Sequence, residues 1–207
     1  SKFSVDILRR AKARGVRVTA EATPHHFALT DDLLSGYDTH FKMNPPLRTE
    51  ADRLELIEGL RDGTLDCIAT DHAPHTWEEK AQPYLQAPSG IPLVQHTLNV
   101  MLEFFHRGEI SLERIVEKMC HAPAIAFRVS ERGFLDEGYW ADLAIVDVHH
   151  AWTLPGEDNI YYKCAWSPFT AKSFRSKVLS TIVSGHLAWH DGQFNESKTG
   201  ERLLFDR

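Results

Sequence analysis

The sequence predicts an α/β fold followed by a mostly β segment, and two observations carry this prediction. Up to residue 128, helical patterns alternate with short strand-like runs that end in loops, an order typical of a parallel sheet covered by helices. Beyond that point, short apolar runs are separated by Glu-Gly, Ser-Gly and Asp-Gly, which are typical of hairpin turns. We therefore predict an α/β unit over 1–128 and a β-rich segment over 129–207.

The spacing of apolar residues and the end signals locate the individual elements. Helices are predicted over 3–14, 49–62, 92–107, 111–119 and 123–128, and strands over 16–24 and 65–72. The second helix has the clearest ends, because Thr49 and Asp52 form a capping start and Gly63 follows its last residue. The first helix carries its apolar residues on one face: Phe3, Ile7, Leu8 and Ala11.

The composition is that of an ordinary globular protein. Hydrophobic residues make up 43% of the 207 residues and charged residues 25%, and the net charge is −6. This acidic balance argues against a nucleic-acid-binding protein, and the apolar runs are too short to span a bilayer. The three cysteines, Cys67, Cys120 and Cys164, lack the paired spacing of a thiolate zinc site, and their odd number favours a reduced, cytoplasmic protein.

The strongest chemical signal is the stretch IATDHAPHT, in which Asp71, His72 and His75 directly follow a buried-type strand. Sites of α/β proteins lie at the carboxyl ends of their strands. A carboxylate there can bind a metal with one oxygen and move a proton with the other. The alternative is that Asp71 caps the next turn and the histidines make ordinary polar contacts. The density of the string favours Asp71 as catalytic residue and metal ligand, with His75 facing the substrate.

Two further loops offer groups for binding a ligand. In KMNPPLR, two prolines stiffen the loop and hold Asn44, whose amide can read a carboxylate or an amide; a purely structural loop asparagine is the alternative. In APSGI, Ser89 and Gly90 expose backbone N–H groups that can hold an anion, although by itself this stretch is also a simple turn. We take Asn44, Ser89 and Gly90 as candidate substrate-binding residues.

Other histidines and the tryptophans are assigned supporting roles. Glu21, His25 and His26 in EATPHH are expected at the end of a strand, where neighbouring side chains alternate and cannot both face one site. We therefore expect the two histidines to support other residues rather than bind a ligand. Four tryptophans are expected to pack within the β-rich segment, namely Trp140, Trp152, Trp166 and Trp189.

Four strings taken together resemble consecutive landmarks of the long bacterial form of dihydroorotase, in the amidohydrolase superfamily. These are TAEATPHHFALTDD, KMNPPLR, DCIATDHAPHTWEEKAQPYLQAPSGI and RGFLDEGYWADLAIVD, and YKCAWSPF adds a later match. The resemblance implies that residues 1–128 are the carboxyl-terminal part of a (β/α)8 barrel. It also implies that 129–207 form part of a small β-sandwich, which the family builds from both chain ends.

The resemblance implies a reaction and roles for single residues. Dihydroorotases interconvert N-carbamoyl-L-aspartate and dihydroorotate in pyrimidine biosynthesis, using a zinc-bound hydroxide. Asp71 resembles the metal-ligating aspartate that also moves the proton. Asn44 and His75 resemble substrate-binding residues, and Ser89 and Gly90 resemble the loop whose backbone holds the substrate. The partner is then a small molecule; a homodimer and an association with aspartate transcarbamoylase stay open.

The family's remaining metal ligands include a His-x-His motif, which does not occur in this sequence. Residues 1–128 are also about half of the roughly 250 residues that a barrel needs. We therefore expect a carboxyl-terminal half that binds zinc poorly, turns over nothing and aggregates when alone. Two other functions stay open: another cyclic amidohydrolase of the allantoinase or dihydropyrimidinase type, and a non-catalytic partner of aspartate transcarbamoylase.

Overall fold

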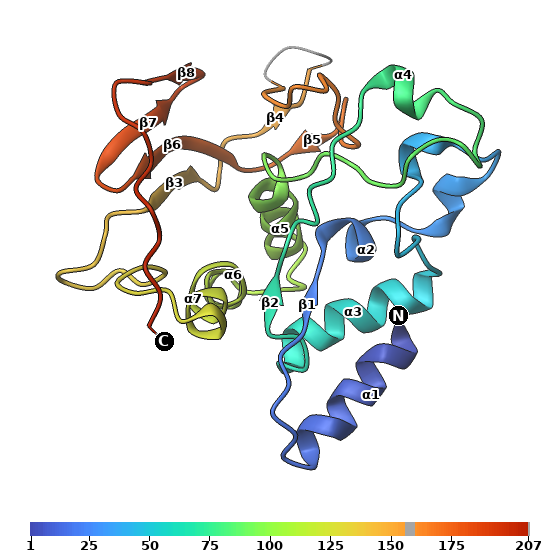
Figure 1. The fold of residues 1–207 in the computed structure, drawn as a ribbon, viewed down its shortest axis with the longest axis horizontal. Helices are drawn as coiled ribbons and strands as arrows, with labels where there is room; N and C mark the ends of the chain where they lie inside the picture. The colour runs from blue at the N-terminus through green and yellow to red at the C-terminus, as the bar shows by residue number, and fades with distance from the viewer. Residues whose placement is uncertain (156–159, 207) are drawn as a thin grey trace.

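The computed structural model describes residues 1–155 and 160–206. Two parallel strands lie at the centre, with two long helices beside them, and an antiparallel sheet lies at the other end of the molecule (Figure 1). The helices are α1 (Lys2–Ala13), α2 (Pro24–Ala28), α3 (Glu50–Asp62), α4 (Trp77–Lys80), α5 (Thr97–His106), α6 (Leu112–Val116) and α7 (Ala122–Phe127). The strands are β1 (Glu21–Ala22), β2 (Cys67–Ile68), β3 (Leu143–Asp147), β4 (Trp152–Thr153), β5 (Ser173–Phe174), β6 (Lys177–Val183), β7 (His186–His190) and β8 (Gln193–Phe194). Short 3-10 turns η1 (Asp31–Leu34) and η2 (Thr39–Phe41) and a π-helical turn η3 (Glu117–His121) complete the elements.

The parallel pair β1–β2 confirms the predicted α/β arrangement of the first part. Glu21 lies opposite Cys67 and Ala22 opposite Ile68, and the Ala69 N–H donates to Ala22 O at 3.1 Å. The strands predicted over 16–24 and 65–72 were too long. Their β-branched residues do favour extended backbone, but a strand also needs ladder hydrogen bonds, which β1 and β2 form over two residues each.

Helix α3 confirms its predicted end signals. The Thr49 hydroxyl accepts the Asp52 N–H at 3.4 Å, and Gly63 ends the helix with a φ of +83°. The predicted apolar face of α1 was wrong in part: Leu8 packs against the core, but Phe3 and Ile7 are exposed. Val5 is the fully buried residue of α1, whereas Phe3 is 70% exposed, because α3 packs over the Val5 side.

The sheet near the carboxyl end has the strand order β3-β6-β7-β8 and is antiparallel. Ser184–Gly185 and Asp191–Gly192 join its hairpins, and all four residues have positive φ, as a type I′ turn requires. These two predicted hairpins are confirmed. Gly138 in the Glu-Gly dipeptide also has positive φ, but no strand precedes it among 129–142, so a hairpin there was wrong. The β-sandwich stays a prediction.

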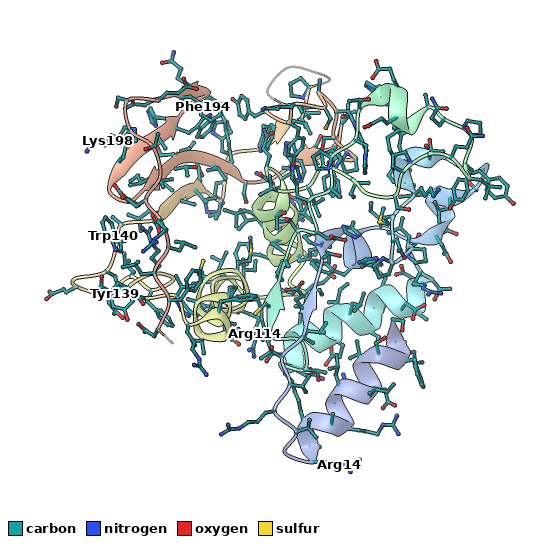
Figure 2. The ribbon with its side chains drawn as sticks, viewed as in Figure 1. Arg14, Arg114, Tyr139, Trp140, Phe194 and Lys198 are labelled. Carbon is teal, nitrogen blue, oxygen red and sulfur yellow. The ribbon has the colours of Figure 1, made fainter. Side chains whose placement is uncertain are left out.

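Aromatic side chains remain exposed around this sheet. Tyr139 and Trp140 lie on the segment that precedes β3, and Phe194 lies on β8 (Figure 2); they are 39%, 43% and 57% exposed. The Arg132 guanidinium covers the Trp140 ring at 4.9 Å. Trp140 therefore packs only partly within the β-rich segment. Trp152 packs there more fully, since its ring stacks on the Phe174 ring with the two ring centroids 5.5 Å apart.

Later residues return to the core of the first part. Leu154, Trp166 and Phe174 are buried in the same hydrophobic cluster as Leu60 and Phe104. Among the described residues, the last helix ends at residue 127 and every later element is a strand, so the change from helices to strands lies where the sequence predicts it. A domain boundary at residue 128 stays a prediction.

Gly133 gives a stability prediction with a matched control. A Cβ at Gly133 would lie 2.5 Å from Ala124 Cβ and 2.8 Å from Cys120 O, whereas one at Gly138 would have nothing within 4 Å. Both residues have a φ above +80°, so Gly→Ala strains the backbone equally. We expect Gly133→Ala to lower the free energy of unfolding by about 1–3 kcal/mol more than Gly138→Ala, through overpacking alone. Urea denaturation measures this difference; equal losses would contradict the packing of Gly133.

Two buried histidines predict sensitivity to acid. Burial lowers the pKa of His25 to about 3, with His26 adding to the effect, and lowers that of His96 to about 4. Because the unfolded chain takes up these protons near the usual 6.5, the free energy of unfolding should fall as the pH drops from 6.5 towards 4. The slope is about 1.4 kcal/mol per pH unit for each histidine.

The measurement is urea denaturation at pH 7, 6 and 5 for the wild type, His96→Gln and His149→Gln. His149 is exposed and serves as the control. His96→Gln should have the shallower pH dependence, and His149→Gln should match the wild type. If all three proteins lose stability in parallel, His96 is not the group that titrates.

Candidate functional site

Asp71 lies three residues beyond β2, in a left-handed backbone conformation with a φ of +47°. Aspartate tolerates this conformation better than most residues. Within the described residues, no side chain is hydrogen-bonded to the Asp71 carboxylate, and the residue is exposed. The carboxylate is therefore available to a ligand at the carboxyl end of β2.

The chain beyond β1 forms helix α2, so the expectation that His25 and His26 end a strand was wrong. Pro24 occupies the first turn, where its missing N–H and fixed φ start a helix. The Thr23 hydroxyl lies 3.1 Å from His25 Nε2 and 2.6 Å from His26 Nδ1, and His26 Nε2 donates to Pro45 O at 2.9 Å. His26 therefore supports the loop that carries Asn44, in line with its predicted supporting role.

The parallel pairing of β1 with β2 brings the segment that carries Asp71 to the same edge as the chain beyond β1. Burial lowers the pKa of His26, while its hydrogen bond to Pro45 and the negative charge of Asp71 both act in the opposite direction. The carboxyl ends of the two parallel strands therefore bring their loops to one edge, as the sequence predicts.

His75, Ser89 and Gly90 lie in contact with each other. His75 Nε2 donates to Ser89 O at 3.2 Å, and its Nδ1 lies 3.5 Å from Glu79 Oε2. Gly90 has a φ of +133°, and a Cβ there would lie 2.7 Å from both Cβ and O of Ala73. Only glycine allows this close approach, which holds the Ser89–Gly90 backbone against the DHAPH stretch.

Asn44 is exposed, and the peptide bond between Asn44 and Pro45 is cis. The Asn44 segment reaches the Ser89–Gly90 segment through Lys42, whose carbonyl accepts the Gly90 N–H at 3.0 Å. The structure thus brings the loops carrying Asn44, His75, Ser89 and Gly90 together. The Gly90 N–H is already hydrogen-bonded within the protein, which leaves the Ser89 N–H as the backbone donor of this pair.

Sequence reasoning missed Lys80 and Trp166. The buried Lys80 ammonium donates to three carbonyl oxygens on the loops around this edge. Trp166 Nε1 donates to His75 O at 2.7 Å, and its ring packs against His40 and Trp77 of the first part. Trp166 therefore supports the site, and its predicted packing within the β-rich segment was wrong. No local signal identifies either residue, because their partners are distant in sequence.

A complete metal site is not formed by the residues that the structure describes. No group of three or more His, Cys, Asp or Glu side chains among 1–155 and 160–206 is arranged to hold a metal ion. Both ring nitrogens of His26, whose pKa burial lowers and the charge of Asp71 raises, are hydrogen-bonded. The Asp71 carboxylate could serve as one zinc ligand, but the described residues do not supply the further ligands that a zinc ion needs. In the same described ranges, no helix is long and apolar enough to cross a bilayer.

Curated proteins similar to this chain are dihydroorotases. The dihydroorotase of Endomicrobium trichonymphae is 44% identical over 187 residues, which cover 90% of this chain and 44% of that protein. The dihydroorotase of Clostridioides difficile is 41% identical over 191 residues, which cover 92% of this chain and 44% of that protein. The chain thus spans less than half the length of the curated relatives that it matches.

Solved structures and a family model give the same assignment. An L-hydantoinase (dihydropyrimidinase) from Arthrobacter aurescens superposes with a TM-score of 0.85 at 27% identity, over 94% of this chain and 44% of the other. A D-hydantoinase from Thermus sp. superposes with a TM-score of 0.86 at 26% identity, over 95% of this chain and 44% of the other. The fold is therefore an α/β fold of the amidohydrolase type. The model of the Amidohydrolase family matches residues 4–188. The chain belongs to the amidohydrolase family.

Proposed function

We propose that this chain is part of a zinc-dependent dihydroorotase, which interconverts N-carbamoyl-L-aspartate and dihydroorotate in pyrimidine biosynthesis in the cytoplasm. The observation that supports the proposal is the set of side chains and loops at the carboxyl ends of β1 and β2. There a carboxylate at the end of β2 lies beside loops that carry an amide, an imidazole and a backbone N–H. Identities of 41–45% to dihydroorotases support the choice of substrate.

Each residue has a role that its chemistry allows. Asp71 is the proposed zinc ligand and the group that holds the proton and returns it to the ring nitrogen, since a free carboxylate can do both. The Asn44 amide and the Ser89 N–H are donors for the substrate carboxylate. His75, fixed by its bond to Ser89 O, lines the same loop, and Gly90 keeps that loop close.

We propose that the remaining zinc ligands come from residues outside this chain, because no group of three or more His, Cys, Asp or Glu side chains in the described ranges is arranged to hold a metal ion. We accordingly propose that the chain alone is inactive. We also propose that residues 1–128 are the last part of a (β/α)8 barrel and that 129–207 are part of a β-sandwich. A homodimer and an association with aspartate transcarbamoylase stay proposals on the resemblance alone.

A second candidate is a cyclic amidohydrolase that acts on neutral rings. The similarity of the fold to L- and D-hydantoinases favours it. The lower sequence identity to these proteins, 26–27% against 41–45% for the dihydroorotases, favours the acidic substrate.

The test compares the chain alone with the chain co-expressed with the part of the Clostridioides difficile dihydroorotase that it does not match. Zinc content by atomic absorption and hydrolysis of dihydroorotate, hydantoin and allantoin are measured. We expect zinc and dihydroorotate hydrolysis only in the complemented protein. Asp71→Ala should lower its kcat by about 10²-fold or more, as expected for loss of a general acid–base group. Asp31→Ala, an exposed control, should have no effect.

Two outcomes would contradict this proposal. Hydrolysis of hydantoin or allantoin, but not of dihydroorotate, would favour the second candidate. Activity of the chain alone would mean that its own residues complete the site. His25, His26, Asp71 and His75 would then have to be considered as ligands, for example across a dimer.

A further inference from the structure

Lys80 is fully buried, although lysine is almost always exposed. It is the last residue of α4, a helix that Thr76 and Glu79 start with a complete capping box. Its Nζ donates to Lys42 O at 3.1 Å, Pro88 O at 3.1 Å and Gly90 O at 3.0 Å. An ammonium has three donors, so all of them are used, and each acceptor is an uncharged backbone carbonyl.

The three carbonyls belong to the two loops that hold the proposed substrate-binding groups. Lys42 precedes Asn44 by two residues, whereas Pro88 and Gly90 flank Ser89. A single ammonium therefore ties both loops to α4, which begins two residues after His75. The Gly90 N–H adds a direct bond to Lys42 O at 3.0 Å.

Neighbouring contacts fix Lys80 in this position. The Thr39 hydroxyl donates to Lys80 O, and Lys42 Nζ donates to Tyr84 O and Ala87 O, both at 2.6 Å. Lys80 forms no ion pair with any residue of the described ranges. Burial and the charge of Lys42 lower its pKa to about 8, which Asp38 opposes.

We propose that Lys80 is a positioning residue of this site, whose ammonium sets the spacing between the Asn44 loop and the Ser89–Gly90 loop and thereby the affinity for an acidic cyclic amide. This inference rests on the proposed function. Lys80 itself does not touch the reacting atoms. Its loss would leave the Pro88 and Gly90 carbonyls without a donor, whereas Lys42 O would keep the Gly90 N–H, and the two loops could then separate.

The first experiment tests the loops in the chain as it stands. Amide hydrogen exchange is compared for the wild type, Lys80→Met and Lys12→Met. Lys12 is a matched control, because it also bonds a carbonyl, Gly63 O at 3.3 Å, and pairs with Asp66 away from these loops. The Gly90 amide should exchange about tenfold faster or more in Lys80→Met alone. Unchanged exchange at Gly90 would overturn the inference.

The second experiment uses the complemented protein and separates positioning from general stability. Lys80→Met should raise KM for dihydroorotate about tenfold or more, with kcat changed less than about threefold, because substrate binding is weakened. Lys12→Met should keep the wild-type KM. An unchanged KM in Lys80→Met would overturn the inference even if exchange is faster. Absence of turnover in the complemented wild type contradicts instead the proposed function, and the exchange result still decides whether Lys80 holds the loops.

The pH dependence gives an independent reading. As the pH rises through about 8, Lys80 loses its charge and one donor, so the wild-type KM should rise towards that of Lys80→Met. Stability should not fall in parallel, because the unfolded chain holds the extra proton up to about 10.5 and deprotonation favours the fold. If the KM of Lys80→Met rises in the same way over pH 7.5 to 9.5, Lys80 is not the group responsible.

Discussion

The arrangement of the candidate site depends on how two loops without regular structure are held to α4, and the buried Lys80 ammonium is the interaction that joins them. Backbone carbonyls of loops usually face water, because a buried loop leaves them without donors. Here three of them point at one cation instead, from Lys42, Pro88 and Gly90. A charged donor suits this role, since its bonds are stronger than those of a neutral group. The loops can therefore be irregular in shape and still fixed in place.

Features set by local interactions could be predicted from the sequence. The ends of α3 at Thr49 and Gly63 and the hairpin at Ser184–Gly185 each depend on a few neighbouring residues, which impose a cap or a positive φ. Asp71 was predicted as a site residue in the same way, because a strand followed by Asp-His is local information. Its left-handed backbone could not be foreseen, since φ at a strand end depends on the loop that follows.

Features set by distant partners could not be predicted. Phe3 has the spacing of a core residue, but which side of α1 is covered depends on where α3 packs. Lys80 and Trp166 contact the site through carbonyls and rings that lie far away in the sequence. A lysine near the end of a short polar helix looks like a solvated residue, and only the folded chain reveals that it is buried. Candidate residues for the chemistry could therefore be proposed from the sequence more easily than Lys80 and Trp166, whose partners are distant in sequence.

This difference bears on how related enzymes come to act on different rings. A TM-score of 0.85 at 27% identity means that the backbone can stay while most side chains change. In this chain the carboxylate lies next to a strand, whereas Asn44, Ser89 and Gly90 lie on loops that the buried side chains of Met43, Leu47 and Ile91 anchor in the core. Changes at the exposed positions of these loops would alter the shape and charge of the candidate site without moving Asp71. The ammonium of Lys80 then has a consequence beyond stability: it bonds backbone atoms only, so the side chains of both loops can vary while the spacing between the loops is kept.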